Sequence, residues 1–353
     1  MRSTFWKNRR VLLTGHTGFK GGWTALWLTK MGAKVYGYSL APPTKPNFYL
    51  ETKLEKKLSG SFIGDICNLK NLSSKIKLVK PSIIIHMAAQ SIVGVSYKKP
   101  VKTFMTNVIG TVNILEAARH VKSVKTLINV TSDKCYEVVN SNKSYKETDR
   151  LGGYDPYSSS KACSELITSA YKNSFFSNIG IASLRAGNVI GGGDWAKNRL
   201  IPDFFRSYYK NKTLHVRSPN SIRPWQHVLE PISGYLLLAE KLTKNQKKYS
   251  EPWNFGPNRK NFNTVSQILR KLEKKLKKSK FKVKDKLKIH ETKLLKLDSS
   301  KSKSLLGWNS CWDIDATLDK TIEWHQAWKN NEDMMKFSLS QINSYIMSIK
   351  KDN

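Results

Sequence analysis

The sequence predicts an α/β protein in which helices cover both faces of a doubly wound parallel sheet, followed by a smaller lobe of mixed structure. Three observations support this prediction. Short apolar runs alternate with helix-length segments, a glycine-rich turn follows the first run directly, and the composition becomes turn-rich after residue 187. Strands that alternate with helices form βαβ units, and the strands of such units are parallel.

Five apolar segments are expected to form this sheet. They are VLLTG from residue 11, AKVYGYSL from 33, SIIIHMAA from 82, KTLINVTS from 125 and NIGIASLRA from 178. Short runs rich in Val, Ile and Leu are typical of strands that are buried on both faces. We expect the fifth segment to complete the sheet, with helices at residues 19–31, 98–120 and 157–171.

The second half of the chain has a different pattern. After Gly187 turn residues become frequent, and helices are predicted at residues 201–210, 231–242, 265–277 and 314–328. We therefore predict two domains, residues 1–186 and residues 187–353, with part of residues 220–250 returning to the first. Because no linker or internal repeat separates them, the two are expected to pack together.

A net charge of +35 raises nucleic acid as a partner. The densest basic segment, residues 270–303, contains fifteen basic and four acidic residues, and nearly all of the basic ones are lysines. Bidentate recognition of bases favours arginine, so we interpret this segment as a solvated surface. No nucleic-acid partner is predicted.

The start MRSTFWKNRR lacks the apolar stretch of a signal peptide, and no apolar run has the ~18 residues of a membrane span. This pattern predicts a cytoplasmic location and no membrane partner. Cys67, Cys135, Cys163 and Cys311 are widely spaced and contain no CxxC pair, so we expect buried thiols without a disulfide or a metal site.

The glycine-rich turn carries the first functional prediction. Gly15, Gly18 and Gly21 follow the first predicted strand and open a helix. In such a turn the first glycine permits the bend, the second admits the pyrophosphate of a dinucleotide, and the third lets helix and strand pack closely. The N–H groups at the start of the helix then face the phosphates.

The end of the second predicted strand bears on which dinucleotide is bound. It reads Tyr36-Gly37-Tyr38-Ser39 and contains neither the carboxylate that binds the ribose 2′-hydroxyl of NAD nor an arginine for a 2′-phosphate, although Lys45 is near in sequence. NAD is predicted over NADP.

Tyr157 and Lys161 are four residues apart, which places them on one face of a helix whose start is marked by Asp155-Pro156. A lysine charge close to a phenol stabilises the phenolate, so Tyr157 is expected to act as a general base. Ser132, Asp133 and Lys134 end another predicted strand, at the sheet edge where α/β folds bind ligands. Surface helix residues and solvated turn residues are the alternative interpretations.

Several motifs together resemble the extended short-chain dehydrogenase/reductase family, a Rossmann-fold family, and within it the sugar nucleotide 4,6-dehydratases. They are TGHTGFKG from residue 14, HMAAQS from 86, TSDKCYE from 131, DPYSSSKA from 155, RAGNVIGGGDW from 185, RLIPD from 199 and RPWQHVLEP from 223. The last three are more specific than the fold signature. The resemblance implies NAD as cofactor, CDP-glucose as substrate and a homodimer that meets through the helices at 98–120 and 157–176.

The resemblance also implies an internal redox cycle. Tyr157 would take the 4-hydroxyl proton while NAD accepts hydride from C4, Ser132 would bind the 4-oxygen, and Lys161 would bind the nicotinamide ribose. Asp133 would protonate the departing 6-hydroxyl before hydride returns to C6. Where related dehydratases carry a glutamate as C5 base, this chain has Lys134, which serves only as a neutral amine, and Glu137 is the alternative.

By resemblance, the cofactor contacts are Gly15, Thr17, Gly18, Phe19, Gly21, Ser39, Asp65, Ala88, Tyr157 and Lys161. The substrate contacts are Gln90, Ser91, Asn107, Asn188, Arg199, Leu200, Arg223 and His227. Alone, His227 would be interpreted as a core or surface histidine. Three other functions stay open: a 4-epimerase, another nucleotide-sugar 4,6-dehydratase, and a non-catalytic RNA-binding protein of the same fold.

Overall fold

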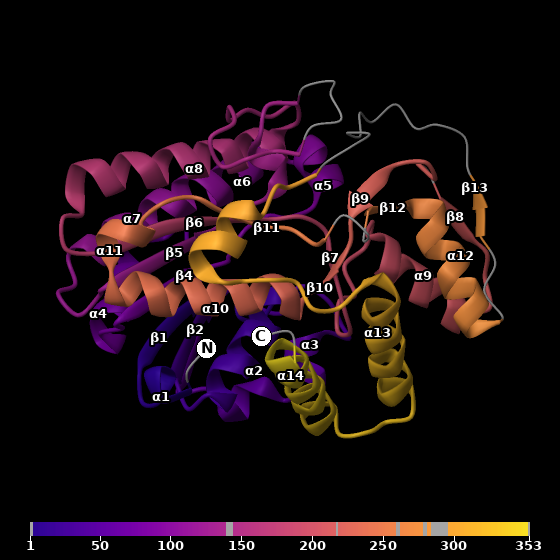
Figure 1. The fold of residues 1–353 in the computed structure, drawn as a ribbon. Coiled ribbons are helices and arrows are strands. Elements are labelled where there is room, and N and C mark those ends of the chain that lie inside the picture. The colour runs from indigo at the N-terminus through magenta and orange to yellow at the C-terminus, as the bar shows by residue number, and fades with distance from the viewer. Residues whose placement is uncertain are drawn as a thin grey trace.

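The computed structural model describes residues 3–138, 144–216, 218–258, 262–277, 281–283 and 296–351. A seven-stranded sheet with the order β11-β6-β5-β4-β1-β2-β3 forms its centre, and every strand pair in it is parallel (Figure 1). The strands are β1 (Arg10–Thr14), β2 (Lys34–Ser39), β3 (Gly60–Ile63), β4 (Ile83–His86), β5 (Thr126–Val130), β6 (Gly180–Ala186) and β11 (Trp253–Phe255). The predicted doubly wound parallel sheet is confirmed.

The expectation that the segment from residue 178 completes the sheet is wrong. That segment is β6, and β11 lies outside it at one edge of the sheet, while β3 forms the other edge. Both edge strands are short, and β3 is not fully buried, so neither forms the apolar run that marks a central strand.

Alternate residues of the strands pack on the two faces of the sheet. Val11 and Leu13 belong to one apolar core, together with α2 (Phe19–Lys30) and α10 (Leu229–Lys244). Leu12 belongs to a second core on the opposite face. The helices of that second face are α4 (Leu69–Val79), α7 (Gly110–Arg119) and α8 (Pro156–Phe175).

The helix expected at residues 98–120 is divided into three contiguous parts. The α-helix α6 (Pro100–Phe104) continues into a π-helical turn at Met105–Ile109 and then into α7. Such π-turns often occur at functional sites. The remaining helices near the sheet are α1 (Ser3–Trp6), α3 (Phe48–Glu51), α5 (Val93–Lys98), α11 (Gln246–Tyr249) and α14 (Met334–Lys351), with 3₁₀-helices at Leu54–Lys57 and Asp133–Cys135 and a second π-helical turn at Ser302–Leu306.

A third apolar core lies in the C-terminal half of the chain, beside the sheet domain (Figure 1). It contains residues of α9 (Leu200–Tyr209), α12 (Val265–Leu276) and α13 (Ile314–Lys329). Three two-stranded pairs accompany these helices: β7 (Val189–Ile190) with β10 (Gln226–His227), β9 (Ile222–Pro224) with β12 (Phe262–Thr264), and β8 (Leu214–Val216) with β13 (Phe281–Val283). The domain boundary at residue 186 stays a prediction. Two elements that follow this boundary in the chain belong with the sheet: α10 packs on its face, and β11 is one of its strands.

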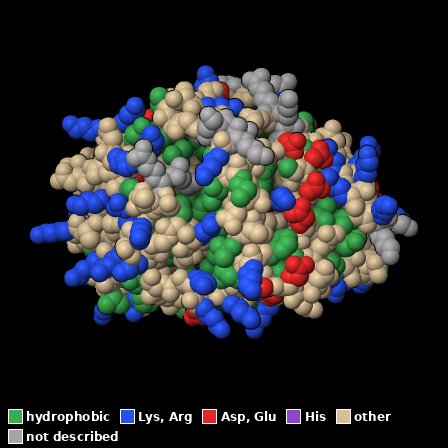
Figure 2. Space-filling model, turned by 60° about the horizontal axis from the view of Figure 1, so that its bottom comes forward, with side chains coloured by type: hydrophobic (Ala, Val, Ile, Leu, Met, Phe, Trp, Pro, Cys, Tyr) green, Lys and Arg blue, Asp and Glu red, His purple; other side chains and the backbone are tan. Residues whose placement is uncertain are grey.

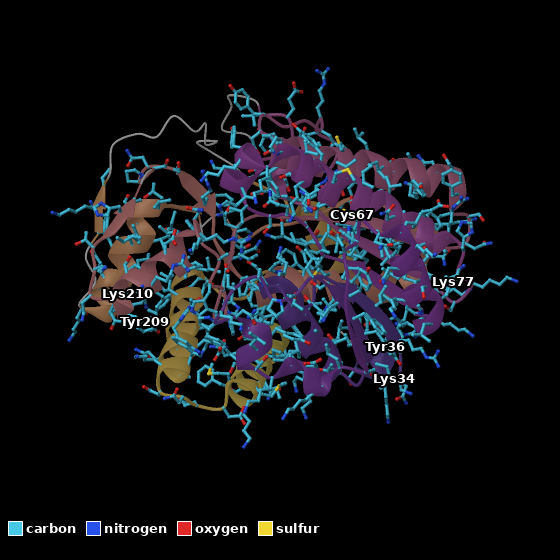
Figure 3. All side chains as sticks on the ribbon, turned by 180° about the vertical axis from the view of Figure 1, so that it is seen from behind. Lys34, Tyr36, Cys67, Lys77, Tyr209 and Lys210 are labelled. Carbon is cyan, nitrogen blue, oxygen red and sulfur yellow. The ribbon has the colours of Figure 1, made fainter. Side chains whose placement is uncertain are left out.

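On the face shown in Figure 2, lysine and arginine side chains are spread widely, whereas acidic side chains gather mainly in one area. Lys34 and Lys77 extend away from the body of the protein (Figure 3). Within the basic segment at residues 270–303, residues 278–280 and 284–295 lie outside the described residues. Among the described helices, none is long and apolar enough to cross a membrane.

The four cysteines are free thiols, and the expectation that all are buried is wrong. Cys135 is buried, but Cys67, Cys163 and Cys311 are only partly buried. In the described part of the chain, no group of three or more His, Cys, Asp or Glu residues has the geometry of a metal site.

Candidate active site

The glycine-rich turn brings backbone segments closer together than side chains permit. Gly15 has a φ of +79°, and a Cβ atom there would lie 2.9 Å from the Ala88 nitrogen. A Cβ at Gly21 would lie 2.0 Å from the Gly15 oxygen. The turn leads into α2, whose first residue is Phe19 and whose N-cap, Gly18, makes no side-chain capping bond. The open N–H groups of this helix start therefore form an anion site.

Thr17 joins this turn to the end of β2. Its hydroxyl donates to the Leu40 oxygen at 2.9 Å and lies 2.8 Å from the Ser39 hydroxyl, which donates to it. At the end of β3, exposed Asp65 accepts a hydrogen bond from the Cys67 N–H at 2.9 Å. An open pocket of about 590 Å³ is lined by Asp65 and Cys67 and by residues between 98 and 106, which belong to the end of α5, to α6 and to the π-turn (Figure 3 labels Cys67).

An alanine at Gly15 is expected to damage this turn. The positive φ costs a residue with a Cβ about 1–2 kcal/mol, and the contact with Ala88 adds to that cost. We expect Gly15→Ala to lower the melting temperature and to reduce the NAD that copurifies. Gly94→Ala is the matched control, because a Cβ at Gly94, in α5, meets nothing within 4 Å. Equal melting temperatures for the two variants would contradict this prediction.

The predicted catalytic pair lies at the start of α8. The Asp155 carboxylate caps this helix by accepting the N–H groups of Tyr157 and Ser158, both at 3.0 Å. Tyr157 and Lys161 are both buried, and the Lys161 ammonium donates to the Val130 oxygen at 3.3 Å. The pair therefore faces the carboxyl end of β5, where the TSDK segment begins.

The environment sets the proton affinities of this pair. Burial raises the pKa of Tyr157 to about 12, against the opposing effects of a hydrogen bond with Ser132 and the charge of Arg199. Burial lowers the pKa of Lys161 to about 8, although the nearby carboxylate of Glu165 favours its charged form. Ser132 and Arg199 therefore favour the phenolate of Tyr157. The part of Lys161 in stabilising the phenolate stays a prediction.

Asp133 lies in a capped turn directly after β5. The Ser132 hydroxyl accepts the Lys134 N–H at 3.2 Å and donates to Asp133 Oδ1 at 3.1 Å. Asp133 is 3% exposed, and among the described residues its Oδ2 has no hydrogen-bond partner. Burial raises the pKa of this carboxyl, while the positive charges of Lys134, Arg223 and Lys20 oppose the rise. Asp133 is therefore suited to carry and donate a proton.

Lys134 and Glu137 differ in exposure. Lys134 is half-buried within the same turn as Asp133, whereas Glu137 is exposed and its backbone N–H pairs with the Arg150 oxygen. Of the two candidates for a C5 base, Lys134 therefore lies beside the catalytic residues.

Asn107, in the π-turn, uses its whole amide inside the protein. Its oxygen accepts the Gln90 N–H at 2.8 Å, and its nitrogen donates to the Gln90 oxygen at 3.0 Å and to the Ser160 hydroxyl at 2.9 Å. Asn107 thus ties the Gln90 loop to the start of α8. In that loop, Ser91 accepts a hydrogen bond from Arg199, which also pairs with Asp194; both distances are 2.9 Å.

The remaining predicted substrate residues lie near β7, β9 and β10. Arg223 is buried beside Asp133, on whose pKa its charge acts, and the Asn188 oxygen accepts the Gln226 N–H at 3.3 Å. Leu200 begins α9. His227 is fully buried against Trp312, with 4.9 Å between ring centroids, so it lies in the core. Its contact with substrate stays a prediction.

Three side chains near the site, Lys20, His16 and Tyr235, were not identified from sequence. Lys20, the second residue of α2, has a pKa lowered to about 8 by burial and by the charges of Arg199 and Lys161, and its ammonium lies 5.7 Å from the Tyr235 ring centroid. His16 is buried with Nε2 2.8 Å from the Ser61 hydroxyl. A lysine and a histidine inside the glycine motif were the signals available for two of them.

Comparisons with known proteins identify the family of this chain. Residues 12–321 match the family described as GDP-mannose 4,6 dehydratase. The chain is 47% identical over 350 residues to CDP-glucose 4,6-dehydratase of Salmonella typhimurium, an alignment that covers 97% of each protein. It is 24% identical over 340 residues to human dTDP-D-glucose 4,6-dehydratase, which covers 92% of this chain and 93% of that protein.

Solved structures share the fold. A dTDP-glucose 4,6-dehydratase from Streptomyces venezuelae, solved with NAD, has a TM-score of 0.78 at 23% identity and covers 92% of this chain and 99% of its own. UDP-glucose 4-epimerase from Thermotoga maritima, solved with UDP-glucose, has a TM-score of 0.80 at 21% identity. The alignment covers 90% of this chain and 98% of the epimerase chain. With a family match over most of its length and a near full-length relative, the chain belongs to the nucleotide-sugar 4,6-dehydratase family.

Proposed function

We propose that this protein is an NAD-dependent hydro-lyase that converts CDP-glucose to CDP-4-dehydro-6-deoxyglucose. The observation that carries the proposal is the buried carboxyl of Asp133, whose pKa is raised and whose Oδ2 has no partner among the described residues, in the same site as Tyr157. An elimination at C6 needs such an acid, whereas an epimerisation at C4 does not. The choice of CDP-glucose rests on the relative that is 47% identical.

The residues present fit NAD as the resident cofactor. The glycine turn leaves backbone N–H groups open at the start of α2, and a Cβ at Gly15 or Gly21 would collide with backbone atoms. Ser39 and Thr17 offer hydroxyls at the end of β2, and Asp65 borders the cavity at the end of β3. NAD bound there would accept a hydride from C4 of the sugar and would later return it to C6.

Tyr157 removes the proton of the 4-hydroxyl in this scheme. Ser132, whose side chain is hydrogen-bonded to Tyr157, orients the 4-oxygen of the substrate. The positive charge of Arg199 favours the phenolate form of Tyr157. Once C4 is a ketone, the C5 proton is acidic, and Lys134, which lies in the same turn as Asp133, is the candidate to remove it in its neutral form. Asp133 gives its proton to the 6-hydroxyl, which leaves as water and leaves a double bond between C5 and C6. The hydride that NAD would return to C6 and the proton that the C5 base would return to C5 complete a net dehydration.

The experiment that tests this function offers the purified protein CDP-glucose, UDP-glucose and dTDP-glucose under identical conditions. A 4-keto sugar has a characteristic absorbance in alkali, which is expected to develop fastest with CDP-glucose. Formation of CDP-galactose instead would identify a 4-epimerase. No product from any of the three would overturn the proposal.

We also infer a homodimer that meets through α6, its π-turn and α8. Val101, Met105 and Ile109 follow one another at four-residue intervals and are 75%, 44% and 38% exposed, and Leu166 of α8 is 58% exposed. These exposed side chains form an apolar stripe on the helices. Burying such a stripe against a second copy is favourable. The cytoplasmic location and the absence of a nucleic-acid partner stay predictions.

Charged residues in this stripe are expected to separate the dimer. The double variant Ile109→Glu/Leu166→Glu should run as a single chain in light scattering coupled to size exclusion, while wild type has the mass of two chains. Leu78→Glu is the matched control, since Leu78 is 67% exposed on α4, outside the stripe. A double variant that keeps the wild-type mass would argue against this interface.

A further inference from the structure

A buried ion pair behind the active site takes no part in the proposed reaction. Glu165 of α8 and Arg185 of β6 are joined at 2.9 Å, and both side chains are 3% exposed. Burying two charges costs much desolvation free energy, so a buried ion pair is weak evidence for stability by itself. Its hydrogen bonds show more clearly which part of the structure it holds.

The Glu165 carboxylate holds the start of the catalytic loop, which we define as residues 131–136. Its Oε1 accepts hydrogen bonds from the Thr131 hydroxyl at 2.5 Å and from Arg185 Nε at 2.9 Å. Its Oε2 accepts from the Ser183 hydroxyl at 2.5 Å and from Arg185 Nη2 at 2.9 Å. Thr131 is the residue directly before Ser132, so the carboxylate fixes the loop where it leaves β5.

The Arg185 guanidinium holds the other end of the catalytic loop. Its Nη1 donates to the Tyr136 hydroxyl at 2.8 Å, and its carbon lies 4.8 Å from the centroid of the Tyr136 ring. The Tyr136 hydroxyl in turn donates to the Asn254 amide oxygen at 2.7 Å. Asn254 belongs to β11, so the end of the loop is anchored to the edge strand of the sheet.

We propose that the Glu165–Arg185 pair is a clamp that positions Ser132 and Asp133 against Tyr157 by fixing both ends of the catalytic loop. The inference rests on the proposed function. Four residues lie between the two anchored ends, and Ser132 and Asp133 are the first two of them. Directional, fully paired charges resist a shift of the loop better than apolar packing does. Glu165 and Arg185 act through the loop and are therefore positioning residues.

Glu165→Gln is the first test, because it keeps the size of the side chain and removes the charge that binds the guanidinium fork. We expect kcat for CDP-glucose to fall by about 10- to 100-fold, with KM within about twofold of wild type, since a small displacement of catalytic groups costs rate rather than substrate affinity. Hydrogen–deuterium exchange at residues 131–136 should rise in the same variant.

Glu230→Gln is the matched control. Glu230 is also fully buried, and its carboxylate accepts hydrogen bonds from the Cys311 and Trp312 N–H groups and the Tyr345 hydroxyl in the C-terminal segment. Both variants should lose thermal stability. In Glu230→Gln, however, kcat and the hydrogen–deuterium exchange of residues 131–136 should stay near wild type. If Glu165→Gln changes both quantities no more than Glu230→Gln does, the clamp is refuted.

A second variant keeps the test decisive if Glu165→Gln fails to fold. Tyr136→Phe removes only the hydroxyl between Arg185 and Asn254, and a loss of about 3- to 10-fold in kcat is expected from one such hydrogen bond. An unchanged kcat and unchanged exchange in this variant would count against the clamp. Wild type that fails to convert CDP-glucose would overturn the proposed function, whereas the exchange comparison would still decide the clamp.

Discussion

Tyr157→Phe is expected to lower kcat for CDP-glucose by about 10³-fold, within the range for loss of a positioned general base. The hydroxyl is the only group removed, and the ring keeps its buried place at the start of α8. Substrate affinity should change little, because the ring and the neighbouring Ser132 and Arg199 remain. The measurement is the steady-state rate of 4-keto sugar formation, with circular dichroism to establish the fold.

Tyr154→Phe provides the comparison for this prediction. Tyr154 is three residues earlier in the chain and 71% exposed, so its variant should keep wild-type turnover. If Tyr157→Phe retained more than about a tenth of the activity, another residue would have to be the base. Lys20, with a pKa lowered to about 8, would then be the first residue to substitute.

Asp133→Asn is expected to reduce kcat by about 10²- to 10⁴-fold, the range for loss of a general acid, and to raise thermal stability at the same time. An amide of the same shape cannot give a proton to the 6-hydroxyl. In the folded protein burial raises the pKa of this carboxyl above its unfolded value. The ionised form therefore destabilises the fold at a pH above the folded pKa, and this penalty disappears at a pH below the unfolded pKa.

Melting temperatures at pH 8 and at the lowest pH the protein tolerates check the stability part of this prediction. Asp133→Asn should melt higher than wild type at pH 8, and the difference should shrink as the pH falls. Asp194→Asn is the control, because the Asp194 carboxylate pairs with Arg199 and its loss removes a favourable contact. A lower melting temperature for Asp133→Asn at pH 8 would show that the buried charge is compensated.

Local chemistry made the centre of the fold predictable from sequence. Each central strand is a continuous apolar run, because it is covered on both faces, and the glycine motif is contiguous in the chain. The pair Tyr157 and Lys161 was predictable for the same reason, since helical spacing places them on one face. In these segments the sequence neighbours are also the structural neighbours.

The parts that could not be predicted depend on contacts between distant segments. β11 contributes only three residues to the sheet and pairs with β6 some 70 positions earlier in the chain, so no periodic pattern marks it. Arg199 reaches Ser91 across 108 positions. Glu165 and Arg185 were given no role from sequence, because their burial and pairing arise only when α8 packs on the sheet.

The place of β11 in the sheet has a consequence for how the chain is made. β6 pairs on one side with β5 and on the other with Trp253–Phe255, so its second edge stays open until the ribosome has added those residues. Trp253 and Phe255 are fully buried and Asn254 anchors the Tyr136 hydroxyl, so a nascent chain ending at residue 186 has neither its last strand nor that anchor. Synthesis must pass through much of the C-terminal half before the dinucleotide-binding sheet is complete.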